Sequence, residues 1–141
     1  MMNCKSCGKP IDEHVVGREL DACMAKGVMG WSRAGLYHVY DEKNETAYEL
    51  MDTNQEKRYS IFVDVWYPSV SIADVWKAVL HIRETDPFNV GVSFCEHIAE
   101  MFDATQDDWV CDVYNVMMGL NPYAICIAIL KAVSEKDLNN G

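Results

Sequence analysis

Cysteine and histidine residues near the start of the chain have types and spacing that suggest metal chemistry. Cys4 and Cys7 stand in the stretch NCKSCGKPI (3–11) and are followed at once by Gly8. A C-x-x-C turn that ends in glycine can direct both sulfurs at one metal ion, and a structural zinc ion takes four such ligands. No second C-x-x-C occurs in the sequence. The two further ligands must therefore be single residues elsewhere.

His14 and Cys23 are the nearest donors, and His38 is more distant. A helix that starts near residue 17 can present Cys23 back toward the turn, so the sequence predicts zinc as a cofactor, held by Cys4, Cys7, His14 and Cys23. Three alternatives stay open: a terminus without metal, a zinc ion completed by a second chain in a homodimer, and a redox pair. The redox pair is disfavoured because a thioredoxin-type pair opens a helix after a strand, and no strand precedes this one.

Sequence motifs of catalysis and phosphate binding are absent. The chain has no G-x-x-x-x-G-K, G-x-G-x-x-G, H-E-x-x-H or G-x-S-x-G. His97 adjoins Glu96 and Cys95, but neighbours on a strand point to opposite faces, so we expect His97 at the surface or in a turn. We therefore predict a protein that is not an enzyme.

The charge of the chain is strongly negative and unevenly distributed. The formal net charge is −10, and the 47 residues between Arg83 and Lys131 contain no lysine or arginine. This gap holds eight carboxylates: Glu84, Asp86, Glu96, Glu100, Asp103, Asp107, Asp108 and Asp112. Direct binding of nucleic acid is disfavoured, because phosphate affinity depends on lysine and arginine. The acidic stretch is either a solvated face or a surface that attracts a basic partner protein.

Aromatic side chains add a second feature of interfaces. Rings left exposed beside carboxylates would form a protein-binding patch. The sequence therefore predicts partner-binding residues Glu96, Glu100, Asp103, Asp107 and Asp108, with Trp31 and Trp66. An alternative is a nucleotide pocket in which such rings stack on a base and Arg33 or Arg58 binds the phosphate. A zinc-stabilised regulator is a weaker alternative, because the charge argues against it.

The hydrophobic pattern predicts alternating helices and strands. We expect helices over 16–31, 71–84 and from 121 to 133, and strands over 59–67, 90–95 and 109–116. The structure of residues 37–58 is left open. Ser71 and Asp74 form a capping pair, and Trp76 and Ile129 should be buried. These elements predict an α+β fold with helices covering a small, largely antiparallel sheet.

The chain has the size of one domain. We divide it into a cysteine-containing extension (1–15), a single domain (16–134) with an enlarged segment at 37–65, and a frayed tail (135–141). No apolar run is long enough to span a bilayer, and the N-terminus lacks the pattern of a secretory signal. We therefore expect a cytoplasmic protein without membrane contact.

Three stretches resemble the phage ABA-sandwich domain, a small family from phages and prophages. Val28, Met29, Gly30 and Trp31 carry its first signature, and Ile72 and Trp76 its second. Its third signature, a final helix, is matched by Pro122, Ala124, Ile125, Cys126, Ala128, Leu130, Lys131, Ala132 and Val133. The resemblance covers residues 16–31 and 66–133. It implies an α/β/α layered domain and a phage source, but no function or catalytic residues.

The resemblance and the acidic stretch together suggest a function. They predict a non-enzymatic phage protein that binds and inhibits a host protein, such as a component of antiviral defence. If the chain instead has the nucleotide pocket described above, its function would be to sequester a small nucleotide signal.

Overall fold

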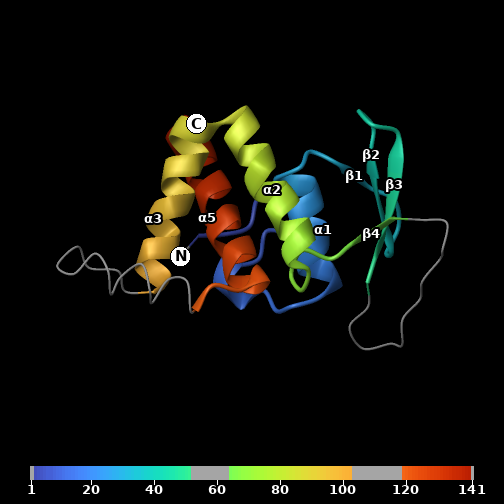
Figure 1. Cartoon of the computed structure of the whole chain (residues 1–141), viewed down its shortest axis with the longest axis horizontal. Helices are drawn as coiled ribbons and strands as arrows, with labels where there is room; N and C mark the ends of the chain where they lie inside the picture. The colour runs from blue at the N-terminus through green and yellow to red at the C-terminus, as the bar shows by residue number, and fades with distance from the viewer. Residues whose placement is uncertain (1, 52–63, 103–118, 141) are drawn as a thin grey trace.

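The computed structural model describes residues 2–51, 64–102 and 119–140. Within these ranges the protein has the α+β fold that the sequence predicts, with four α-helices and one four-stranded sheet. In Figure 1 the helices α3, α5, α2 and α1 follow one another across the molecule, and the sheet lies beyond α1. The described helices thus lie on one side of the sheet. None of them is long and apolar enough to cross a membrane.

The N-terminal part contains a short 3-10 helix and the first α-helix. The 3-10 helix η1 spans Ile11–Glu13, and α1 spans Arg18–Gly27. Leu20, Cys23 and Met24 are buried on one face of α1, which confirms the predicted helical face. The helix occupies the central part of the predicted range 16–31.

The sheet is built mostly from the segment whose structure the sequence leaves open. Strands β1 (Ser32–Arg33), β2 (His38–Asp41), β3 (Thr46–Leu50) and β4 (Asp64–Trp66) lie in that order. The β1–β2 and β2–β3 pairs are antiparallel, and the β3–β4 pair is parallel. Of the predicted strand 59–67, residues 64–66 form β4, and residues before 64 lie outside the described part.

Three aromatic rings connect the sheet to α1. The ring of Trp31 stacks on that of Tyr48 with centroids 4.5 Å apart, and Trp66 meets Trp31 edge-on at 4.7 Å. The indole N–H of Trp66 donates a hydrogen bond to the backbone oxygen of Asp21 in α1 at 3.0 Å. Offset and edge-on ring pairs of this kind stabilise a core beyond the area they bury. These rings therefore hold the sheet against the helical part.

Helix α2 spans Ile72–Thr85 and begins as predicted, because the hydroxyl of Ser71 accepts a hydrogen bond from the Asp74 N–H at 3.2 Å. The prediction that Trp76 is buried is wrong, since its exposed fraction is 52%. The buried face instead centres on Val75, Ala78 and Ile82. Trp76 follows Val75 and so lies about 100° further around the helix, away from that face.

A helix replaces the predicted strand at 90–95. A π-helical turn η2 (Pro87–Gly91) leads into α3 (Val92–Met101). The Asp86 carboxylate accepts a hydrogen bond from the Asn89 N–H at 3.2 Å and so starts this segment. The alternation in VGVSFC misled the prediction, because a short apolar run does not distinguish a strand from a helix. The predicted strand 109–116 lies outside the described residues.

Helix α5 (Pro122–Asn140) is the longest element and lies among the other helices. Asn121 caps it as predicted, with its side-chain oxygen accepting from the Ala124 N–H at 2.9 Å. Ile125 and Ile129 are buried, which confirms the prediction for Ile129. Helix α5 contacts α1, α2 and α3, so its apolar residues are covered from several sides. It also continues to Asn140, where a frayed tail from residue 135 was expected.

The Ser71 cap gives a first test of this fold. Replacing Ser71 with Ala leaves the Asp74 N–H without its side-chain acceptor, and we expect unfolding free energy to fall by about 1 kcal/mol. Urea denaturation measures this change. Ser32→Ala is a suitable control, because Ser32 is exposed in the edge strand β1, and a change within about 0.5 kcal/mol is expected there. Equal effects of the two substitutions would contradict the assigned cap.

Candidate metal centre

The C-x-x-C segment forms a tight turn that positions two of the four predicted ligands. Asn3 pairs with Pro10 in an antiparallel bridge, and the Cys4 N–H donates to the Lys9 oxygen at 2.7 Å. The Gly8 N–H closes the turn on the Cys4 oxygen at 2.8 Å. Gly8 has a φ of 79°, which glycine adopts without strain. The sequence Cys-Gly therefore has a structural reason, because the chain must reverse directly after Cys7.

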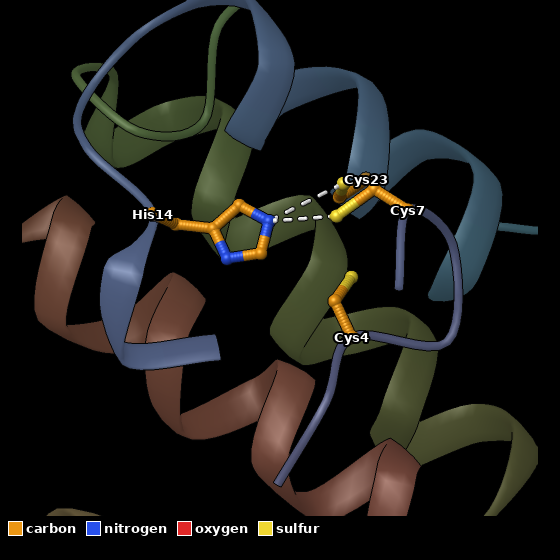
Figure 2. A group of neighbouring side chains, drawn as sticks. All are labelled: Cys4, Cys7, His14 and Cys23. Carbon is orange, nitrogen blue, oxygen red and sulfur yellow. Dashed lines mark hydrogen bonds between the residues drawn. The ribbon is translucent and has the colours of Figure 1, made fainter. Parts of the chain in front are cut away.

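His14 is oriented by its second ring nitrogen. Its Nδ1 lies 3.0 Å from the backbone oxygen of Ile11. A carbonyl oxygen can only accept a hydrogen bond, so Nδ1 carries a proton, and in the neutral ring Nε2 then has the free lone pair. Figure 2 shows this Nε2 pointing at the sulfurs of Cys7 and Cys23. A backbone carbonyl that fixes the tautomer in this way is typical of histidines that bind metals.

Cys23 reaches the site from the inner face of α1. The hydroxyl of Ser6 donates to the backbone oxygen of Cys23 at 3.3 Å, so the turn packs directly on the helix. A β-carbon at Gly27 would lie 2.7 Å from the Ser6 hydroxyl oxygen. Glycine at position 27 therefore permits the close approach of the turn to α1.

The structure brings all four predicted ligands together. One donor atom from each of Cys4, Cys7, His14 and Cys23 lies within 4.8 Å of the other three. The His14 Nε2 is 3.3 Å from the Cys7 sulfur and 3.6 Å from the Cys23 sulfur. In a tetrahedral zinc site with Zn–S of about 2.3 Å and Zn–N of about 2.0–2.1 Å, a sulfur and a nitrogen lie about 3.6 Å apart. The spacing is thus compatible with a zinc site within one chain.

The thiols influence one another's protonation. The pKa of Cys4 is lowered to about 5, first by a hydrogen bond from the Cys23 thiol and also by hydrogen bonds from the backbone amides of Cys7 and Ser6, whereas burial acts in the opposite direction. The pKa of Cys23 is raised well above its usual value, first by its hydrogen bond to Cys4 and then by burial. A thiolate is the form that binds metal, and the lowered pKa of Cys4 favours this form.

Helix α5 anchors the segment that carries His14. The hydroxyl of Tyr123 donates to the His14 oxygen at 2.5 Å. Lys131 lies 2.9 Å from the Asp12 carboxylate. The four donors thus belong to the cysteine turn, to the residue that follows η1, and to α1, and these segments all pack against the core of the fold.

The predicted partner-binding residues do not form one surface. Trp31 and Trp66 have exposed fractions of 8% and 0%, so the expected aromatic patch is wrong, and these rings are part of the core. Glu96 and Glu100 are exposed on α3. Asp103, Asp107 and Asp108 lie outside the described residues. Of the predicted partner-binding residues that the structure describes, only these two glutamates are therefore at the surface.

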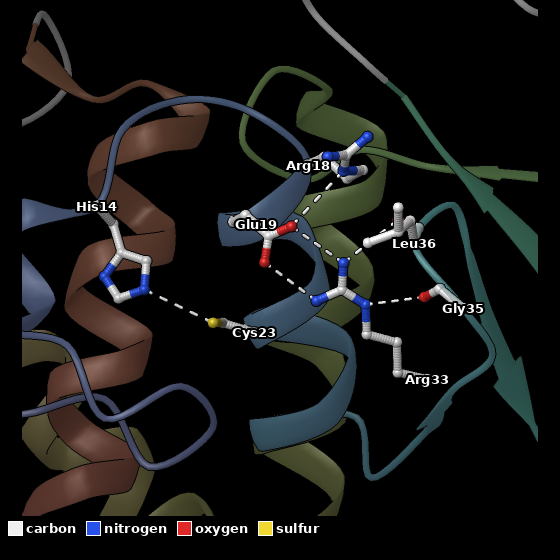
Figure 3. Close-up of polar contacts among 7 residues, drawn as sticks. All are labelled: His14, Arg18, Glu19, Cys23, Arg33, Gly35 and Leu36. Carbon is white, nitrogen blue, oxygen red and sulfur yellow. Dashed lines mark hydrogen bonds and ion pairs between the residues drawn. The ribbon is translucent and has the colours of Figure 1, made fainter.

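One of the two phosphate ligands predicted for the nucleotide alternative, Arg33, is already paired. The guanidinium of Arg33 forms two hydrogen bonds of 3.0 Å with the Glu19 carboxylate and further bonds to the backbone oxygens of Gly35 and Leu36 (Figure 3). This pairing raises the pKa of Arg33 and lowers that of Glu19. A phosphate would have to displace an existing carboxylate. Arg58 lies outside the described residues.

A buried histidine on α3 was misassigned by the sequence analysis. His97 is buried rather than at the surface or in a turn. Its Nε2 lies 2.9 Å from a Glu135 carboxylate oxygen of α5, and its Nδ1 lies 3.4 Å from Glu100. Glu100, one helical turn away, could have indicated part of this cluster. Glu135 could not, because only the packing of α3 on α5 brings it near.

Comparisons with protein-family models, with curated proteins and with solved structures gave no match.

Proposed function

We propose that this chain is a zinc-stabilised binding domain in which Cys4, Cys7, His14 and Cys23 hold one structural zinc ion. The observation that supports this most directly is the convergence of four donor atoms within 4.8 Å. The protein supplies all four ligands of a tetrahedral site, which is the arrangement of structural zinc, whereas catalytic zinc keeps a position open for water or substrate. Burial of Cys4, His14 and Cys23 further supports a structural role.

The zinc ion would add a direct link between segments that already contact one another and the core. The turn at residues 3–10 meets α1 through the Ser6 hydrogen bond, and η1 meets α5 through Tyr123 and Lys131. Metal coordination would fix the turn, η1 and α1 at a common point. Because such a site forms only in the folded chain, the free energy of metal binding adds to folding free energy.

Metal analysis tests this proposal. Protein purified without chelator should contain about one zinc per chain, and Cys4→Ser with Cys23→Ser should reduce the zinc content to background. Cys95→Ser is a matched control, because Cys95 is a free, exposed cysteine on α3 outside the cluster. Inductively coupled plasma mass spectrometry gives the ratio. Equal zinc content in the double variant and the control would contradict the proposal, as would a metal-free parent that takes up no added zinc.

We also propose, as a second function, that the acidic face of α3 binds a basic partner protein. The exposure of Glu96 and Glu100 supports this, and the latter side chain is 80% exposed. The resemblance to a phage family would make the partner a host protein and the domain its inhibitor. Electrostatic attraction of this kind raises the association rate at low salt and weakens as salt is added.

Charge reversal tests the second function. Glu96→Lys with Glu100→Lys should slow association with a partner captured from host lysate and remove its salt dependence. Glu42→Lys with Glu45→Lys reverses two exposed carboxylates at the β2–β3 turn and serves as the control. Thermal melting of both variants shows whether the fold persists. If the α3 variant is folded and binds the partner as the parent does, Glu96 and Glu100 do not take part in binding and only form a solvated face.

A further inference from the structure

We propose that Cys7 is the site at which hydroperoxides oxidise the zinc centre and release its metal. This inference depends on the zinc binding proposed above. It assigns to one ligand a reactivity that the other three lack, and it makes the metal centre responsive to oxidants.

The four ligands differ sharply in their access to solvent. Cys4, Cys23 and His14 have exposed fractions of 2%, 4% and 7%, whereas Cys7 is exposed. Oxidation of cysteine requires both thiolate character and access. A zinc-bound cysteine has thiolate character at every position of the cluster, so access distinguishes the four ligands. Cys7 is therefore the sulfur that a soluble oxidant reaches first.

A groove beside the site gives a small molecule a place to approach. It has a volume of about 310 Å³, and its lining includes Cys7, with Val15 at its rim, and charged side chains of both signs: Lys9, Glu13, Arg18 and Glu19. Val15 is 77% exposed, so the rim is open to solvent. Cys4 and Cys23 do not line this groove.

The reaction balances with a hydroperoxide as the oxidant. The Cys7 thiolate attacks one peroxide oxygen, the O–O bond breaks, and hydroxide or alkoxide leaves while Cys7 becomes a sulfenic acid. A second ligand thiolate, Cys4 or Cys23, then attacks the Cys7 sulfur, forming a disulfide and releasing hydroxide. The two sulfurs lose two electrons and the peroxide gains two. Both partner sulfurs are within reach, since the donor atoms lie within 4.8 Å of one another. Zinc thereby loses two of its four ligands and dissociates.

Peroxide treatment of the unsubstituted, zinc-loaded full chain tests the proposed oxidation. Zinc release is followed with a chromogenic chelator, and the first sulfenic acid is trapped with dimedone and mapped by mass spectrometry. We expect the earliest label within the cluster on Cys7, and one equivalent of zinc released as a disulfide that contains Cys7 forms. A first label on Cys4 or Cys23 would overturn the inference, as would zinc release without oxidation of Cys7.

Substituting one metal ligand for another tests the role of Cys7 separately from the proposal that the chain binds zinc. Cys7→His keeps four ligands that suit zinc but removes the exposed thiolate, and release by peroxide should be slower on the order of tenfold or more. Cys95→Ser, which removes an exposed thiol outside the cluster, should release zinc at the parent rate. Release from a zinc-loaded Cys7→His protein at the parent rate would refute the role of Cys7. A parent that binds no zinc would instead refute the proposed function, and the dimedone map decides the inference if Cys7→His fails to load.

Discussion

Removing zinc from the protein should lower the free energy of unfolding by about 4 kcal/mol or more at free zinc concentrations about a thousandfold above the dissociation constant. A chelator would remove the common point that joins the cysteine turn, η1 and α1. The aromatic core between α1 and the sheet and the apolar faces of α5 would remain, so we expect a loosened N-terminal region and not complete unfolding. Thermal melting with and without chelator measures the loss of stability.

Hydrogen exchange shows which parts of the protein lose stability when zinc is removed. Amides of residues 3–14 and of α1 should exchange faster after chelation, whereas those around Ile129 in α5 should change least. The Cys4→Ser and Cys23→Ser double variant should be insensitive to chelator, since it has no metal to lose. A parent that melts at the same temperature in both conditions, with unchanged exchange near Cys4, would contradict a structural role for the metal.

Ile129→Asp should prevent the chain from folding stably. Ile129 is fully buried in α5, and a carboxylate there would lose its hydration without gaining a partner. The expected loss is on the order of 5 kcal/mol or more, which is comparable with the whole stability of a typical domain. Yield of soluble protein and circular dichroism measure the outcome.

Ile72→Asp is the matched control for this substitution. Ile72 is 58% exposed and is the first residue of α2, where a negative charge interacts favourably with the helix dipole. The same chemical change should therefore leave the fold intact. If Ile129→Asp were as stable as Ile72→Asp, the position of α5 in the core would be wrong.

The cluster of candidate metal ligands could be predicted from the sequence because its donors are close along the chain. Cys4, Cys7, His14 and Cys23 fall within twenty residues, so a turn and one short helix suffice to bring them together. Helix caps were accessible for the same reason, since Ser71 and Asn121 act on residues only three positions away. These features depend on contacts between residues that are close in sequence, so the spacing of residue types is enough to predict them.

Features that depend on packing between distant segments could not be predicted in this way. The face of α2 that is buried depends on what packs against it, so Trp76 was assigned to the wrong side. The expected interface rings Trp31 and Trp66 are buried because Tyr48, from a strand that the sequence did not reveal, completes their cluster. His97 is buried because Glu135 of α5 lies beside it. In each case the deciding contact comes from a different element.

X-ray absorption spectroscopy at the zinc edge tests the central claim most directly, because it reports the atoms bound to the metal. The structure predicts a first shell of three sulfurs at about 2.3 Å and one nitrogen at about 2.0–2.1 Å, with one sulfur lost in Cys23→Ser. A shell of oxygen and nitrogen alone, or one unchanged in Cys23→Ser, would show that zinc binds elsewhere and would contradict the assignment of Cys4, Cys7, His14 and Cys23 as its ligands.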